Sequence, residues 1–339
     1  MKILIIGDVH LRFELPYSSV FSDGRRDEWK AVQESMYKEA KNCDAVMFLG
    51  DFYNSRHNHS SVIKDSISFL KAFGDKEIHI ISGNHCRYGT STALDFLQRL
   101  GRKNWHIHTE PEQVSIAGLQ AMMVPYMTPA LLEVATKEEG VVELVSRFPK
   151  QKIPLAFMHH AVESSMINEL IMGLPEIVIP DASLSVFGHT FFGHIHTSQK
   201  VSDTVIGTGN VFTQEVGEHE KSIWTYEDGK VEEIKLPVRG IYKVMFSGND
   251  SGFFDLGSIP SASIVKAIIT DRGVVLEEVK EALKRFNASM IIEQYPSTRT
   301  KFHFEDGGID LSIEGLLKLY AEEKKLSYAE LIEGYELIK

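Results

Sequence analysis

The sequence predicts an α/β fold, and three observations lead to this expectation. Short, continuous apolar runs such as residues 3–6 and 45–49 are typical of buried strands. Between these two runs, apolar side chains recur at helical spacing: Trp29, Val32, Met36 and Ala40. Several apolar runs lead directly into glycine turns that carry Asp, Asn or His, as expected where the strands of an α/β sheet present polar side chains.

The alternation continues along the first two thirds of the chain. Helices are predicted over residues 62–70, over residues 91–100 with Ser91 or Thr92 as the cap, and over residues 129–147 with Pro129 in the first turn. Strands are predicted at residues 78–81, 119–124 and 155–158. Residues 223–226 and 231–236 are expected to pair as a hairpin around the turn Asp228-Gly229.

The pattern changes after Pro237 and Gly240. A strand at residues 264–269, a helix at 274–286 and a strand at 290–293 indicate a small separate unit without metal-binding residue types. Two short helices are predicted at 312–325 and 327–337, the second capped by Ser327. We therefore expect three parts, with boundaries at residues 1–240, 241–300 and 301–339.

The C-terminal part combines acidic charge with exposed apolar surface. From Glu305 to the end it carries nine acidic and four basic residues. Its apolar side chains exceed what two short helices can bury alone, and we expect them to dock a partner. The alternative is a solvated helical hairpin.

Composition limits the function classes. A chain of 339 residues has room for two domains with their own cores. The net charge of −11 argues against a protein that coats DNA by electrostatics alone, but not against a nuclease with bound metal ions. No apolar run approaches the roughly 20 residues that span a membrane. With only two cysteines and no disulfide framework, the chain is expected to be cytoplasmic.

Five short signatures carry the candidate chemistry. In order they are Gly7-Asp8-Val9-His10, Gly50-Asp51, Gly83-Asn84-His85, Met158-His159-His160 and Gly193-His194-Ile195-His196. Each follows a predicted strand, so their side chains are expected to meet at one edge of a sheet. Asp, Asn and His together supply the oxygen and nitrogen ligands of borderline divalent metals, and there are too many for one ion. Two metal ions in one site suit phosphate ester hydrolysis.

Individual ligands can be assigned from chemistry. Asp8 and His10 are expected on one extended strand tip, within reach of one ion. Asp51 is the bridging candidate, because a carboxylate can bind two cations and an imidazole cannot. Asn84 offers a neutral oxygen, and His194 and His196 can serve one ion each. The residues alone leave open whether His159 or His160 is the ligand, and each residue taken singly could be a hydrogen-bonded turn or core residue.

The order and spacing of the signatures resemble the calcineurin-like metallophosphoesterase superfamily. This resemblance implies a four-layer α/β/β/α sandwich with two divalent metal ions, for which manganese is the family expectation. It selects His159, which directly follows its strand, and implies that His85 faces the substrate, where it stabilises the phosphate or protonates the leaving oxygen. One departure is Cys86, where the family usually has Asp or Glu. We expect this thiol to be a packing residue, with soft-metal binding or oxidation as alternatives.

Further segments resemble the SbcD/Mre-eleven DNA nucleases of that superfamily. They are Gly50-Asp51-Phe52-Tyr53 followed by Arg56, then residues 205–210 after the last signature, and Lys221-Ser222-Ile223-Trp224. The residue three after the bridging Asp is often His in that family and is Asn54 here. The short chain is most like the compact versions encoded by tailed bacteriophages, which would place it in the host cytoplasm.

This second resemblance implies a DNA exo- or endonuclease acting in end processing, recombination and repair. It also implies a small α/β capping domain and C-terminal helices that grip an SbcC/Rad-fifty-type ATPase. The nuclease would be a homodimer within a heterotetramer. The alternative functions are a small-molecule phosphodiesterase or phosphatase, or a scaffold that has lost catalysis, although none of the expected ligands is missing.

Overall fold

The computed structural model describes residues 1–21, 24–165, 176–247, 256–271, 274–286, 288–293 and 327–328. The chain divides into two compact units, Met1–Tyr295 and Pro296–Lys339. In the second unit, only Ser327 and Tyr328 are described, so the predicted C-terminal helices lie outside the described residues. The three predicted domain boundaries remain predictions.

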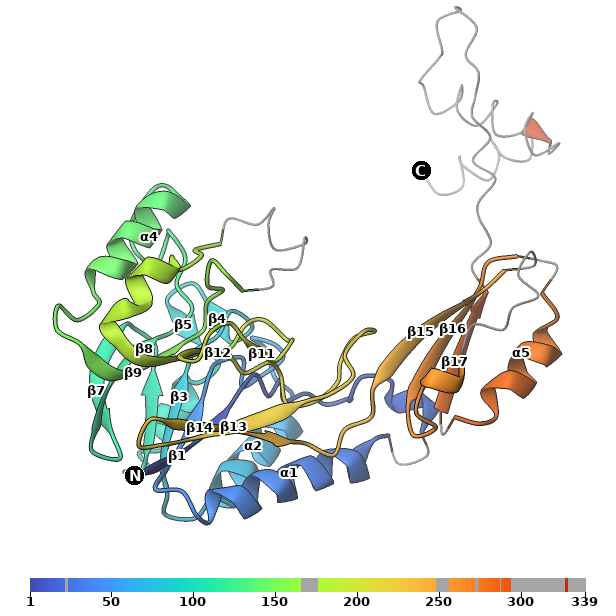
Figure 1. Cartoon of the computed structure of the whole chain (residues 1–339), viewed down its shortest axis with the longest axis horizontal. Coiled ribbons are helices and arrows are strands. Elements are labelled where there is room, and N and C mark those ends of the chain that lie inside the picture. Colours follow the sequence, from blue (N-terminus) through green and yellow to red (C-terminus); the bar gives the residue numbers. More distant parts are fainter. Residues whose placement is uncertain are drawn as a thin grey trace, which may run out of the picture. The chain divides into compact units, whose positions relative to one another are not determined.

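Two six-stranded sheets form the body of the first unit (Figure 1). The first has the order β14 (Lys230–Lys235), β13 (Ser222–Glu227), β1 (Lys2–Ile6), β2 (Ala45–Phe48), β3 (Glu77–Ile81) and β6 (Trp105–His108). The second has the order β11 (Gln199–Lys200), β12 (Val205–Gly207), β10 (Phe187–Phe192), β9 (Ile153–Met158), β8 (Leu119–Val124) and β7 (Glu112–Ile116). A short hairpin pairs β4 (Arg87–Tyr88) with β5 (Ser91–Thr92).

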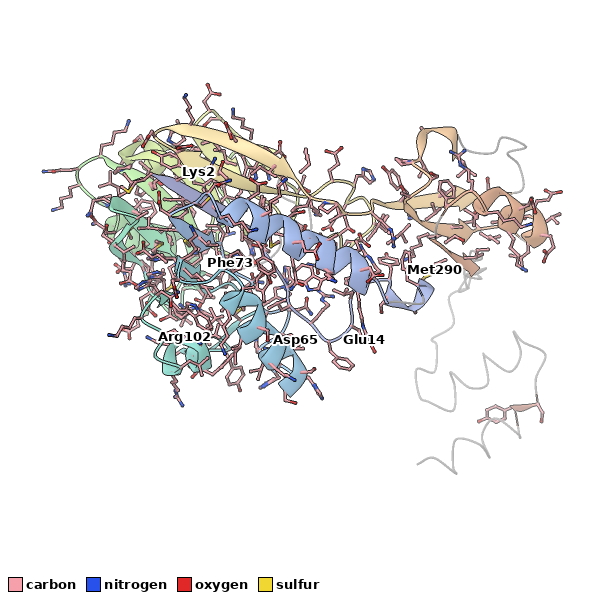
Figure 2. The ribbon with its side chains drawn as sticks, turned by 90° about the horizontal axis from the view of Figure 1, so that it is seen from below. Lys2, Glu14, Asp65, Phe73, Arg102 and Met290 are labelled. Atoms are coloured by element: carbon pink, nitrogen blue, oxygen red, sulfur yellow. The ribbon has the colours of Figure 1, made fainter. Side chains whose placement is uncertain are left out.

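Helices cover the outer faces of the two sheets. Helices α1 (Arg26–Ala40) and α2 (Ser60–Lys71) lie beside each other against the first sheet, as Figure 2 shows from below, and α3 (Asp95–Arg99) follows them in the chain. Their apolar side chains share one core with that sheet, where Val32 and Met36 meet Leu4 and Phe48. Helix α4 (Lys137–Ser146) covers the second sheet.

A third core lies between the two sheets and includes Ile3, Met47, Leu155 and Phe191. Strands β1 and β2 are buried along nearly their whole length, as expected for apolar runs covered on both faces. The layers therefore run α/β/β/α, which confirms the predicted fold class. Three short 3₁₀ helices complete the described elements: η1 (Ser18–Val20), η2 (Asp181–Val186) and η3 (Leu256–Ser258).

Two predicted helices begin later than the sequence suggested. Residues 91 and 92 pair with β4 as strand β5, so α3 begins only at Asp95. Helix α4 begins at Lys137 because Thr136 and Glu139 form a capping box there. The segment after Pro129 instead forms hydrogen-bonded turns, including Val134 N–H to the Pro129 carbonyl at 3.0 Å, and Glu133 has a φ of +58°. The reciprocal cap determined the true start of α4, and the earlier proline did not.

The predicted hairpin is confirmed. Strands β13 and β14 are antiparallel, and Asp228 and Gly229 have φ values of +49° and +86°, as a two-residue type I′ turn requires. The later strands β15 (Ile241–Phe246), β16 (Ile264–Ile269) and β17 (Ala288–Glu293) form a separate parallel sheet, with α5 (Leu276–Leu283) in the β16–β17 crossover. Strand β15 was not predicted. Within the described parts of the chain, no helix combines the length and apolar character that a membrane crossing requires.

Candidate metal centre

All five signatures meet at one edge of the sandwich. Strands β1, β2 and β3 are parallel neighbours in the first sheet, and β9 and β10 are parallel neighbours in the second. Because the carboxyl ends of parallel strands lie at the same edge, the residues that follow them converge. Backbone bonds join the tips directly: His10 N–H donates to the Asp51 carbonyl at 2.8 Å, and Gly193 N–H donates to the Met158 carbonyl at 3.0 Å.

The signature glycines make room for the polar side chains. A Cβ atom at Gly83 would lie 2.1 Å from Asp51 Oδ1, and one at Gly50 would lie 2.1 Å from His159 Nδ1. Gly50 also has a φ of +103°, a conformation that other residues rarely adopt. The glycines therefore allow the tips of β2, β3 and β9, which come from both sheets, to approach closely enough to share one site.

The extended strand tip predicted for Asp8 and His10 is wrong in detail, and two other tips also turn. His10, Asp51 and His194 have φ values of +50°, +34° and +76°, so each lies in left-handed rather than extended backbone. Such strained non-glycine residues persist where the surrounding structure holds them, and they cluster at functional sites. The backbone of each tip turns sharply at these residues.

One group of donor atoms comes from Asp8, His10 and His196, whose candidate ligand atoms lie within 4.8 Å of one another. The Nε2 atoms of His10 and His196 face each other at 3.1 Å. His196 Nδ1 lies 3.3 Å from a Glu218 carboxylate oxygen, to which it donates, so its Nε2 carries a lone pair. The Nδ1 atom of His10 is buried and has no hydrogen-bond partner among the described residues.

A second group comes from Asn84, His159 and His194. Asn84 Oδ1 lies 3.0 Å from His159 Nε2 and 3.0 Å from His194 Nδ1. The other ring nitrogens of these histidines bond to acceptors: His159 Nδ1–H donates to the Leu49 carbonyl at 2.6 Å, and His194 Nε2–H donates to Glu176 at 2.9 Å. In the neutral form of each ring, the nitrogen that faces Asn84 therefore carries the lone pair that a metal ligand needs.

Asp51 lies between the two groups. Its Oδ2 atom is 3.4 Å from His159 Nε2, 3.9 Å from His10 Nε2 and 4.0 Å from His85 Nε2. Its Oδ1 atom accepts a hydrogen bond from His85 N–H at 2.8 Å. The carboxylate is thus held by the backbone on one side while its other oxygen is directed toward both donor groups.

The structure distinguishes His159 from His160. His160 Nδ1 lies 3.1 Å from the Ile177 carbonyl, and its Nε2 accepts from Met127 N–H at 3.1 Å. Burial lowers the pKa of His160 to about 3, and both nitrogens are occupied by the backbone. His159, in contrast, directs its Nε2 atom toward Asp51 and Asn84. The geometry thus agrees with the choice of His159.

Two carboxylates at the site belong to no predicted motif. Glu176 bonds to His194, and Glu218 bonds to His196, so each fixes the orientation and tautomer of one histidine. Glu218 also lies 3.2 Å from the buried Lys221 ammonium group. Burial alone would raise the pKa of Glu218, but the His196 hydrogen bond and the Lys221 charge lower it to about 2. Neither glutamate follows a strand tip, so no sequence signal marked them.

The buried carboxylates of the centre favour positive charge next to them, as the pKa values of the surrounding groups indicate. Burial raises the pKa of Asp8, and the charge of Asp51 raises it further. Burial would also raise the pKa of Asp51, but His159, His10 and His85 hold it below its ordinary value. Burial opposes protonation of His159, yet Asp51 and Asp8 raise its pKa to about 9. The negative charge that favours a proton on His159 would equally favour a divalent cation in its place.

His85 lies at the opening of the centre. Its side chain is 43% exposed, whereas those of Asp8, Asp51 and His159 are at most 3% exposed. A hollow of about 260 Å³ adjoins it, lined by Asn54, Ser55, Arg56, His57, Asn84 and His85. Both Asn84 and His85 of the third signature line this hollow, and the side chain of His85 is open to solvent there.

Cys86 and two of the nearby arginines are structural. Cys86 is fully buried in the core of the first sheet, and burial raises its pKa to about 12, so it packs there as a protonated thiol. Arg25 is also fully buried and forms a two-bond ion pair with Glu28. Arg87 is buried and donates to Ser82 at 3.0 Å. Arg56, by contrast, lines the hollow beside His85.

The comparisons with known proteins agree with the site. The family model described as calcineurin-like phosphoesterase matches residues 1–198, which is more than half of the chain. This chain belongs to the calcineurin-like phosphoesterase family, whose members are metal-dependent hydrolases of phosphoester bonds. The Asp and His clusters described above are able to bind divalent metal ions, as the family requires.

Several solved structures are similar over most of this chain. A novel archaeal phosphodiesterase is 15% identical, with a TM-score of 0.35, and covers 70% of this chain and 100% of its own. The protein TT1561 of Thermus thermophilus is 11% identical, with a TM-score of 0.41, and covers 69% and 98%. Thermotoga maritima protein TM1076 is 14% identical, with a TM-score of 0.30, and covers 69% and 97%. No curated protein sequence matches the chain.

Proposed function

We propose that this chain is a DNA nuclease that hydrolyses phosphodiester bonds with two divalent metal ions. The observation that carries the proposal is the position of Asp51 between two donor groups, with His85 exposed beside a hollow. Asp8, His10 and His196 would hold one ion, and Asn84, His159 and His194 the other, with Asp51 shared. The donor set of carboxylate, amide and imidazole groups suits manganese, the metal we propose.

When bound, two such ions would supply positive charge for the phosphate oxygens and lower the pKa of a coordinated water. The residues of the chain supply the rest. Asp51 holds its orientation through the His85 N–H bond, and Glu176 and Glu218 orient His194 and His196. In its doubly protonated form, His85 would give the Nε2 proton to the leaving oxygen and keep the Nδ1–H that bonds to the Asn54 carbonyl at 3.0 Å, so the ring stays oriented during the transfer.

DNA is favoured as the substrate by the segments that resemble SbcD/Mre-eleven nucleases. The hollow beside His85 is open to solvent along a surface that includes Arg56, which forms no ion pair with any carboxylate in the described part of the chain. A cation beside the reacting group is suited to a neighbouring backbone phosphate. The small α/β unit of β15, β16, α5 and β17 follows the metal centre in the chain, where that family has its capping domain.

The resemblance to the SbcD/Mre-eleven nucleases also supports a proposal about binding partners. We propose that residues 301–339 dock an SbcC/Rad-fifty-type ATPase, and that two nuclease chains form a homodimer within a heterotetramer. The ATPase would supply much of the DNA-binding surface, which would reconcile a net charge of −11 with a polyanionic substrate.

The test is a cleavage assay with manganese on labelled single-stranded and double-stranded oligonucleotides, beside a small chromogenic phosphodiester. Natural protein, His85→Ala and the matched control His189→Ala are compared; His189 packs on Tyr226, away from the centre. We expect DNA cleavage by the natural protein and the control, with loss in the His85 variant. Turnover of the small ester without DNA cleavage, also in the presence of the ATPase, would favour a small-molecule phosphodiesterase instead.

A further inference from the structure

A second cluster of histidines and glutamates lies outside the candidate metal centre, on β3, β6 and β7. His79 of β3 pairs in parallel register with His106 of β6. Glu77 and His79 share one face of β3, and His106 and His108 share one face of β6, because side chains alternate along a strand. This is the face directed toward the second sheet, since Ile81, on the same face of β3, packs in the core between the sheets.

The side chains of this cluster are linked by a continuous series of contacts. Glu77 Oε1 lies 3.0 Å from His79 Nε2, and His79 Nδ1 lies 2.8 Å from His108 Nε2. His108 Nδ1 lies 2.7 Å from Glu112 Oε1. At the other end, Glu77 Oε2 accepts a hydrogen bond from Ala117 N–H at 2.9 Å. This series of contacts therefore joins β6 and β7, the edge strands of the two sheets.

The two histidines of this cluster carry too few protons for all of its contacts to be hydrogen bonds. Three contacts between donors and acceptors need three protons, whereas two neutral imidazoles carry two. If His108 Nδ1–H donates to Glu112, its Nε2 accepts from His79 Nδ1–H. His79 Nε2 then presents a lone pair to the Glu77 carboxylate at 3.0 Å. Two lone pairs at this distance repel unless a cation lies with them.

A further proton is one candidate for that cation, and the burial of the cluster opposes it. Burial lowers the pKa of His79 to about 4, with Glu77 acting in the opposite direction, and burial also lowers the pKa of His108. Neutral imidazoles and ionised carboxylates are the forms that bind metal ions. His106 provides a third donor, and the candidate ligand atoms of Glu77, His79 and His106 all lie within 4.8 Å of one another.

We propose that Glu77, His79 and His106 form a separate binding site for one divalent transition metal ion of the zinc class. Two ligands of a tetrahedral ion at about 2.1 Å stand about 3.4 Å apart, and the His79–Glu77 contact is already close to this separation. His106 stacks on His79 with 4.6 Å between ring centroids, and its candidate ligand atom lies within 4.8 Å of those of His79 and Glu77, so a rotation of the His106 ring would complete the site.

The rest of the cluster fits this assignment. With an ion on His79 Nε2, His79 Nδ1–H donates to His108, and His108 Nδ1–H donates to Glu112, so every contact has its proton. Carboxylate and histidine partners behind a ligand are typical of protein metal sites. The half-buried His106 leaves water access to the ion. Because Glu77 also binds Ala117 of the β7–β8 turn, the ion would join the edges of the two sheets and serve stability rather than catalysis.

The test is zinc content of the full chain after loading and extensive dialysis, measured by mass spectrometry, for the natural protein, His106→Ala, Glu77→Gln and the control His189→Ala. We expect each cluster variant to lose about one ion per chain while the control loses none. An Asp51→Asn background, in which the catalytic ions are weakened, should still retain this ion and show zinc-dependent thermal stabilisation that His106→Ala abolishes.

Equal metal content in all four proteins would overturn the proposal. Failure to stabilise the Asp51→Asn background with zinc would do so as well, since a proton would then occupy the place between His79 and Glu77. Circular dichroism checks that His106→Ala remains folded. None of these outcomes depends on whether DNA is the substrate.

Discussion

The main-chain carbonyl of Asn54 accepts a hydrogen bond from His85 Nδ1–H at 3.0 Å. The side chain of Asn54 is directed elsewhere, because its Oδ1 atom accepts from the guanidinium group of Arg12. His85 is thus oriented by the backbone at position 54 rather than by the side chain there. The departure from the histidine that is frequent at this position in the similar nucleases leaves the placement of His85 intact.

This relationship predicts different effects for two substitutions. Asn54→Ala keeps the carbonyl, so we expect kcat on DNA to stay within about tenfold of the natural protein. His85→Ala removes the group that we propose to protonate the leaving oxygen, and we expect a loss of about 10²–10⁴-fold in kcat. Steady-state kinetics with manganese at a fixed pH measures both. Equal losses in the two variants would mean that the Asn54 side chain acts directly on the substrate.

The shared position of Asp51 predicts its effect on metal content. Asp51→Asn removes the charge between both donor groups, so we expect both catalytic ions to be lost at limiting manganese. Under the proposed assignment Asp8 is a ligand only in the group with His10 and His196, so we expect Asp8→Asn to lose one ion. Metal analysis after gel filtration gives the counts. The bridging assignment fails if Asp51→Asn loses no more than Asp8→Asn.

Glu176 and Glu218 are expected to tune metal affinity without binding the ions. Glu176→Gln and Glu218→Gln weaken the orientation of His194 and His196, and we expect a roughly 10–100-fold increase in the Kd for manganese. Titration of the metal-free protein measures this. Glu143→Gln, on the exposed face of α4, is the control and should leave the Kd unchanged. Unchanged affinity in both site variants would show that the histidines hold their orientation without these carboxylates.

The raised pKa values of the two buried cysteines predict that the free energy of unfolding decreases at alkaline pH. Burial raises the pKa of Cys43 to about 11 and that of Cys86 to about 12, above the ordinary value of 9.0. Since the folded pKa values lie above the unfolded ones, the stability that they contribute is fully present below pH 9 and is lost as pH rises through 11 and 12. For Cys43 we expect a loss of about 1 kcal/mol between pH 8 and pH 10.

Urea unfolding at the two pH values, for the natural protein and Cys43→Ala, measures this contribution. The variant should show the smaller decrease in the free energy of unfolding. A thiol reagent at pH 8 should find no reactive cysteine in the folded chain and two after unfolding, because both side chains are buried. Rapid modification of the folded protein would contradict both expectations.

Much of the architecture could be predicted from local pattern. The apolar runs that became β1, β2, β3 and β9 are buried on both faces, and this made them recognisable. Strands β6 and β7 were missed because they carry His, Gln and Glu where an apolar run was expected. They are the edge strands of their sheets, where polar side chains are tolerated.

Some residues of the candidate site could likewise be predicted from local pattern, and others could not. Residues directly after a buried strand, such as Asp51 and Asn84, were found because a strand end fixes where the next side chain lies. Glu176 and Glu218 were not, since they reach His194 and His196 from segments with no strand before them. His79, His106 and His108 belong to none of the five signatures, and only the parallel register of β3 and β6 brings them together.

The sequence by itself determined the fold class, the order of the strand tips and the types of donor atom they carry. These follow from residue pattern and side-chain chemistry, which are local properties. Only the tertiary structure decided which donors share a cation, which of His159 and His160 faces Asp51, and which carboxylates orient the histidines. Those depend on distances between segments far apart in the chain, and such distances exist only once the two sheets have packed against each other.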